Sequence, residues 1–93
     1  MYCQNLVFSR HAIQQMFFRR ISQREVQSVV NYGEIIEENP EDTPFPSYLL
    51  FDLVEGKPLH VVFSYDESTD TGYVVTAYTP DRSIWQDDFR KRR

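Results

Sequence analysis

The chain has 93 residues, of which 41% are hydrophobic, 15% aromatic and 26% charged. This length suits one domain with one modest core, and the composition excludes a disordered chain. The single cysteine, Cys3, excludes an internal disulfide bond. No stretch approaches the ~20 apolar residues of a membrane span, and the first ten residues lack the apolar run of a signal peptide. We therefore expect a cytoplasmic protein that does not contact a membrane.

The formal net charge of −4 at pH 7 is unevenly distributed along the chain. Residues 1–33 carry four arginines and one glutamate, whereas residues 34–88 carry thirteen acidic residues against one lysine and one arginine. Residues 89–93, FRKRR, carry four basic side chains. Either basic end could contact nucleic acid or an acidic partner, and the alternative is that both are simply solvated.

Two helices are predicted before residue 34. Ser9 can cap a helix over roughly residues 10–19. Its predicted apolar face consists of Ala12, Ile13, Met16 and Phe17. Ser22 and Glu25 form an S-x-x-E capping box for a second helix, which Gly33 can end. The apolar stripe of the second helix is Val26, Val29 and Val30.

After Gly33 the hydrophobic period changes to that of strands. Strands are predicted at residues 34–39, 47–54, 58–66 and 73–79. The intervening segments are a loop with three prolines, the turn EGK and a polar loop over residues 67–72. Residues 81–93 are predicted to be a tail, either disordered or partly helical with Trp85 docked on the domain.

This order of elements predicts one α+β domain over residues 1–93. Short connections make neighbouring strands antiparallel, so we expect a mainly antiparallel sheet of three to four strands. The two N-terminal helices should pack on one face, which gives two layers. The other face of the sheet should then be partly open, and a functional site could lie there.

His60 is the most informative residue of the predicted sheet. If Tyr65 pairs with Tyr73 across the polar loop, His60 lies opposite Tyr78, with Thr76 on the same face. If Val54 pairs with Pro58 across EGK, Asp52 also lies opposite His60. A one-residue slip at that turn would move Asp52 to the other face.

Such a cluster would contain the groups that cleave RNA through its 2′-hydroxyl. His60 would act as a general acid or base, and Asp52 would orient its ring. The Tyr78 phenol and nearby arginines would bind phosphate. The alternative is that His60 bonds a neighbouring side chain and Tyr78 simply packs.

The remaining chemical groups give weaker signals. His11 lies in the first turn of the first helix beside Arg10, and it is either a second acid–base group or an exposed ring. Two histidines and one cysteine without short ligand spacing predict no metal site. No glycine-rich phosphate loop or nucleophile motif is present, so no cofactor is expected.

Three segments resemble the small bacterial family called domain of unknown function 4258. They are SRHAIQQMFFRRIS, PFPSYLLFDLVEGKPLHVVFSYD and YVVTAYTPDRSIW, and they span about residues 9–85. The positions that match the family pattern are His11, Arg19, His60, Thr76, Tyr78, Asp81 and Trp85. Gln15 stands where relatives often have Arg, and Arg20 stands where they often have Gly.

The resemblance implies distant kinship with RelE/ParE-like and BrnT-like toxins, and hence a RelE/ParE-like two-layer fold. It also implies an antitoxin partner with a zinc-finger or helix-turn-helix domain. The hypothesis is then a toxin-like endoribonuclease acting on mRNA. His60, Tyr78, His11 and Asp52 would be catalytic, and the substrate-binding residues would be Arg19, Arg20, Arg82, Thr76, Asp81 and Trp85.

The alternative hypothesis is a non-catalytic protein-binding module of the same fold. Its partner would contact an aromatic face made of Phe18, Phe45, Tyr48 and Trp85, with FRKRR bound to an acidic surface. The net negative charge favours this alternative, because phosphate binding is mainly electrostatic.

Overall fold

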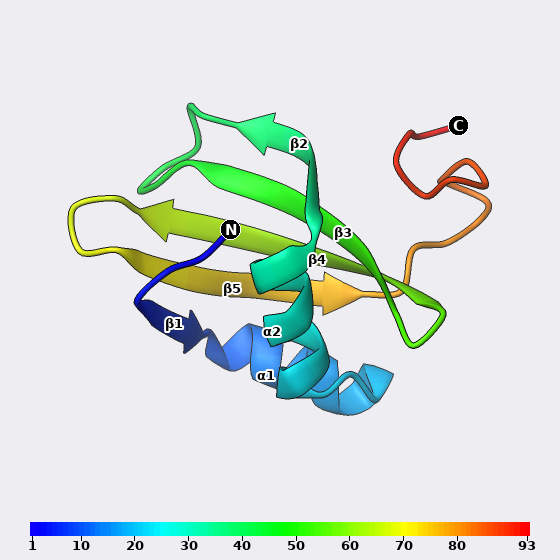
Figure 1. Cartoon of the computed structure of the whole chain (residues 1–93), viewed down its shortest axis with the longest axis horizontal. Coiled ribbons are helices and arrows are strands. Elements are labelled where there is room, and N and C mark those ends of the chain that lie inside the picture. The colour runs from blue at the N-terminus through cyan, green and yellow to red at the C-terminus, as the bar shows by residue number, and fades with distance from the viewer.

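The computed structural model describes all 93 residues and has an α+β architecture (Figure 1). In chain order the elements are β1 (Asn5–Phe8), α1 (Arg10–Arg19), α2 (Gln23–Tyr32), β2 (Glu34–Asn39), β3 (Ser47–Val54), β4 (Lys57–Asp66) and β5 (Thr71–Tyr78). The strands form one sheet in the order β1-β5-β4-β3-β2. Neither ten-residue helix is long or apolar enough to cross a membrane.

The expected number of three to four strands is wrong, because β1 adds a fifth strand. β1 pairs in parallel with the first half of β5, so the sheet is mixed. The other three pairs are antiparallel, as predicted. β1 has only four residues, of which Leu6 and Phe8 are half-buried, and a segment this short shows no clear strand period.

Both helices begin at the predicted caps. The Ser9 side chain accepts a hydrogen bond from the Ala12 amide, and Ser22 and Glu25 form the complete capping box. α1 ends at Arg20 in the left-handed conformation, with φ of 57°, which a glycine adopts at lower cost. Gly33 ends α2 in extended rather than left-handed backbone.

The helices cover one face of the sheet and enclose the main core. Twelve buried apolar residues form it: Ala12, Met16, Ile21, Val26, Val29, Val30, Leu50, Leu59, Val61, Phe63, Val74 and Ala77. The predicted burial of Ile13 and Phe17 is wrong, because their side chains are 46% and 81% exposed. The buried stripe of α1 is therefore only Ala12 and Met16.

The opposite face of the sheet is not open where His60 lies, contrary to expectation. Residues 81–93, which we call the C-terminal segment, follow β5 and pack on that face through Trp85 and Phe89. Figure 1 shows this segment coiled beside the sheet, away from the two helices. It contains no helix, although the Trp85 amide bonds the Asp81 carbonyl in a single turn. The domain therefore has a third layer at this end.

The register places His60 opposite Tyr78 and Val62 opposite Thr76, as predicted. The assumed pairing of Tyr65 with Tyr73 is wrong by one residue, because an irregularity after Val62 shifts the far end of the ladder.

The predicted pairing of Asp52 with His60 is also wrong. The β3–β4 turn has two residues, Glu55 and Gly56, with φ of 53° and 80°. Val54 consequently pairs with Lys57, and Phe51 lies opposite His60. Because side chains alternate between faces, Asp52 belongs to the face that carries the helices.

Candidate functional site around His60

His60 is fully buried between the sheet and the C-terminal segment. Its Nε2 atom lies 2.8 Å from the Phe89 carbonyl oxygen, and its Nδ1 atom lies 3.3 Å from the Tyr78 hydroxyl. A carbonyl only accepts, so Nε2 donates to Phe89 and Nδ1 accepts from Tyr78. The neutral imidazole thus satisfies both ring nitrogens within the protein.

Aromatic rings surround this imidazole. The Trp85 ring meets it edge-on at 4.5 Å between centroids, Tyr78 at 5.3 Å and Phe51 at 5.7 Å. Burial lowers the pKa of His60, and the hydrogen bond to the Phe89 carbonyl opposes this only in part. Burial also raises the pKa of Tyr78. Both groups are therefore held neutral, and the His60 ring is closed off from water, an arrangement that suits structure better than proton transfer.

The C-terminal segment is attached by the basic residues that the sequence suggested for a partner. Arg90 Nε lies 2.8 Å from Glu34, and Arg92 Nε lies 3.1 Å from Glu37, both glutamates being on β2. Their guanidinium groups also lie over Phe51 and Trp85, at 5.0 Å and 4.6 Å from the ring centroids. Most of the charge of FRKRR is thus neutralised within the chain.

Several other polar residues of the segment make contacts within it. Asp81 begins the turn by accepting the Ser83 amide at 2.8 Å. The Arg82 guanidinium lies 5.4 Å from the Phe89 ring centroid, and Arg93 pairs with Asp87. Arg82 and Asp81 therefore stabilise the C-terminal segment over His60. Trp85 of this segment faces the sheet and is only 2% exposed.

The family described as Domain of unknown function (DUF4258) matches residues 8–79. The chain belongs to this family. No curated protein and no solved structure matches the chain, so kinship with RelE/ParE-like toxins stays a prediction. In this DUF4258 chain, the matched residues end at Thr79, and only Pro80 separates them from the C-terminal segment that covers His60.

The other predicted phosphate-binding groups of this DUF4258 domain do not converge on His60. Arg19 Nη1 donates to the Ala77 carbonyl at 2.8 Å and to Thr76 Oγ1 at 3.3 Å, and so covers the end of the β5 edge beyond β1. Arg20 is exposed at the end of α1, and His11 is exposed near its beginning. Arg19 therefore lies at the β5 edge, whereas Arg20 and His11 lie on the exposed side of α1.

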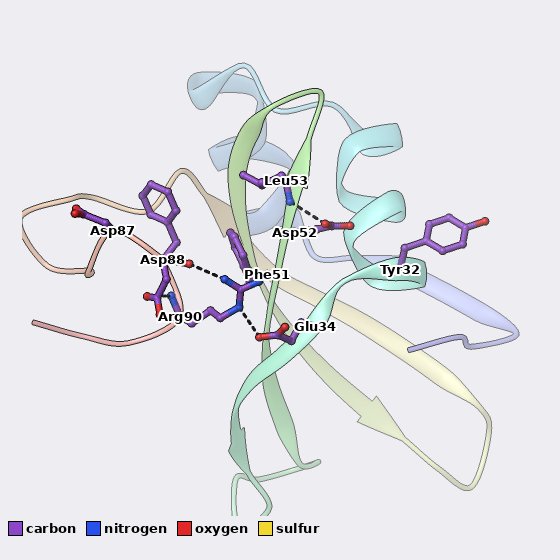
Figure 2. A pocket seen from close by; sticks show the side chains of 9 residues that line it. Tyr32, Glu34, Phe51, Asp52, Leu53, Asp87, Asp88 and Arg90 are labelled. Carbon is purple, nitrogen blue, oxygen red and sulfur yellow. Dashed lines mark hydrogen bonds and ion pairs between the residues drawn. The ribbon is translucent and has the colours of Figure 1, made fainter.

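Asp52 lines a different hollow of the DUF4258 domain, a pocket of about 360 Å³ between the C-terminal segment, β2 and β3 (Figure 2). Figure 2 shows Asp52 directed toward the α2 side, while Arg90 bridges Glu34 and the carbonyl of Asp88. The pocket is lined by Tyr32, Glu34, Phe51, Asp52, Leu53, Asp87, Asp88, Phe89 and Arg90. The Arg90 guanidinium in this pocket is already paired with Glu34. No group of three or more potential ligands is placed to hold a metal ion.

The predicted aromatic face is likewise divided. Phe45 stacks on Tyr73 at 5.7 Å, Tyr48 packs against the helix-side core, and Trp85 is buried over His60. Of these four residues only Phe18 is largely exposed, and its ring centroid lies 6.1 Å from that of Phe17 on α1. The sequence held a signal for the docked tail that the prediction did not use. FRKRR and the acidic strand EIIEEN have opposite charge.

Proposed function

We propose that this DUF4258 domain is a non-catalytic module that binds a partner protein. The observation that carries the proposal is the closed environment of His60. Its ring has no exposed surface, and both nitrogens are hydrogen-bonded inside the protein. A general acid or base must reach a substrate proton directly or through one water, and this ring does neither in the structure as it stands.

The exposed apolar surface supports binding. Phe17, Phe18 and Tyr32 are each about 80% exposed, with values of 81%, 78% and 81%. Exposed aromatic side chains with neighbouring arginines are typical of the energetically important residues of protein interfaces. A RelE/ParE-like fold and an antitoxin-type partner belong to this proposal, since a toxin-like domain without cleavage activity would act by binding alone.

Size-exclusion chromatography of the tagged chain from extract of its own host tests the proposal. We expect a second protein to co-elute with the chain at a fixed ratio. The complex of the two should persist after nuclease treatment. The purified protein should leave single-stranded RNA intact when the two are mixed at equal concentrations. A lone monomer in extract would contradict the binding role.

A second candidate is an endoribonuclease of a toxin–antitoxin pair. The observation that favours it is the arrangement beneath the C-terminal segment, where His60 and Tyr78 are in contact and Thr76 lies on the same face. The Arg19 guanidinium, at 3.3 Å from Thr76, would add a cation for phosphate. This reading requires the segment to lift before RNA can reach His60.

Loosening the cover in the full chain tests the ribonuclease reading. The Trp85→Ala variant should cleave mRNA faster than the wild type if the segment masks an active site. Adding His60→Gln to that variant should then abolish cleavage. An inactive Trp85→Ala protein with an exposed His60, as judged by its NMR titration, would rule out this mechanism.

A further inference from the structure

The outward side of α1 combines exposed apolar side chains with arginines that have no partner. Helical spacing places Arg10, Ile13 and Phe17 in one stripe, and His11, Gln14 and Phe18 in the stripe beside it. Arg20, the exposed C-cap residue, follows at the end of the helix. We call these seven residues the α1 outer face. Ala12 and Met16 occupy the opposite, sheet-facing side, so the outer face plays no part in the core.

The apolar part of this face is large for a ten-residue helix. Ile13 is 46% exposed, Phe17 81% and Phe18 78%. Ile13 and Phe17 are four residues apart, which is the spacing by which one helix presents anchors to another. Sequence periodicity predicted both for the core, and the domain instead leaves them in water.

The charges of the α1 outer face are as distinctive as its apolar residues. Arg10 and Arg20 make no ion pair and no side-chain hydrogen bond, whereas Arg90, Arg92 and Arg93 are all paired with carboxylates. Residues 1–33 contain a single acidic side chain, Glu25, which is used in the capping box of α2. The basic charge at this end of the domain is thus left available.

We infer that the α1 outer face binds an acidic amphipathic helix of a partner protein. The apolar stripe of the partner would pack along Ile13 and Phe17, and its flanking carboxylates would pair with Arg10 and Arg20. The inference rests on the proposed binding function and adds the surface and the class of partner.

A helix fits this face better than RNA does. Unpaired arginines are few on the α1 outer face, and residues 34–88 carry thirteen acidic side chains that would repel phosphate. An aliphatic anchor such as Ile13 contributes to helix packing but offers nothing to base stacking. A carboxylate-flanked helix uses both the apolar stripe and the two cations.

Titration of the ¹⁵N-labelled full chain with two probes tests the inference. One probe is a synthetic helical peptide with Leu at heptad positions a and d and Glu at the flanking positions. The other is a ten-nucleotide single-stranded RNA. We expect the peptide to shift the amides of residues 10–20 saturably, and to bind at least tenfold more tightly than the RNA at 50 mM salt.

Surface variants give the matched comparison. Phe17→Ser and Arg10→Glu should each weaken peptide binding about tenfold, which corresponds to ~1.4 kcal/mol. Arg10 begins α1, where a glutamate is favoured by the helix dipole, so the variant should fold normally. Ile84→Ser, at a 49% exposed position in the C-terminal segment, should bind as the wild type does.

Four results would overturn the inference. Peptide-induced shifts centred on the sheet or on the pocket beside Asp52 would place binding elsewhere and leave the proposed binding function standing. Tighter binding of the RNA at the α1 outer face would replace the protein partner by nucleic acid. Unchanged peptide binding by Arg10→Glu and Phe17→Ser would remove this face from the interaction. A host partner that co-elutes normally with the Phe17→Ser chain would likewise exclude this face alone.

Discussion

The two faces of the sheet are buried by different kinds of interaction. The helix side encloses twelve apolar residues and no buried polar side chain of its own, so burial of surface alone holds it together. The opposite side has a cluster of four buried apolar residues that surrounds the buried His60. A segment without regular structure closes this cluster. That segment is held by hydrogen bonds, ion pairs and cation–π contacts.

This difference implies unequal cooperativity. Removing a helix would expose the main core and unfold the domain. The C-terminal segment covers only one end of the sheet, and its ion pairs are exposed and of low energy. It can therefore detach while the helix side remains folded, as local unfolding of weakly attached segments generally does.

The largest expected effect is on the helix side. Phe63 is fully buried in the centre of β4, and the Gly72 backbone packs closely against its ring. Phe63→Ala should lower the free energy of unfolding by ~3–5 kcal/mol, from lost burial and a residual cavity. Urea denaturation measures this change. Phe18→Ala, at a 78% exposed position, is the matched control and should stay within about 0.5 kcal/mol of the wild type.

A smaller loss of stability is expected on the opposite side of the sheet, although the truncated residue, Trp85, is larger than Phe63. Trp85→Ala should cost about 2 kcal/mol in global stability, less than the ~3–5 kcal/mol typical of buried aromatic truncation. The reason is that the segment can detach instead of leaving a cavity. Amide exchange at Gln86 and Phe89 should accelerate, while exchange at Val61 in the core stays slow.

Equal acceleration at Gln86 and Val61 would mean that both faces unfold together. The Trp85→Phe variant is the control, because it keeps an aromatic ring over His60. Its segment amides should exchange at rates close to those of the wild type.

The helix side was predictable from the sequence because its signals are local. The Ser9 cap and the Ser22–Glu25 capping box each act within one turn, and the structure contains both. Local patterns could not separate core from exposed surface, however. Ile13 and Phe17 have the period of buried residues yet lie in water, because nothing in the period says which apolar side faces the sheet.

The site was less predictable because it depends on long-range contacts. The predicted His60–Tyr78 pair was confirmed, but only because the irregularity after Val62 offsets the one-residue error in the assumed pairing of Tyr65 with Tyr73. Asp52 was misplaced because Glu-Gly forms a tight two-residue turn that usually carries Asn-Gly or Asp-Gly. The cover over His60 arises from contacts such as Arg90 with Glu34, 56 residues apart, which no periodicity encodes.

The pH dependence of stability gives the finest test of the second face. His60 is neutral in the folded state with a lowered pKa, and in the unfolded chain its pKa returns to the ordinary value of 6.5. As pH falls below about 6.5 the unfolded state takes up this proton first. The contribution of the neutral His60 to the free energy of unfolding is therefore complete above that pH. It declines below that pH, by at most ~1.4 kcal/mol per pH unit for one proton.

Urea denaturation between pH 7.5 and 5.5 measures this slope, and His60→Gln should remove it. Asp66, Asp81 and Asp88 have pKa values lowered from 3.8, so they act at more acidic pH and do not confuse the result. Among charged groups, Glu37 raises the pKa of His60 and Arg92 lowers it. Stability that rises on acidification through pH 6.5 would mean that the folded state holds imidazolium. The Phe89 carbonyl and Glu37 would then have to outweigh burial, and a charged His60 would restore the case for an acid–base group beneath the C-terminal segment.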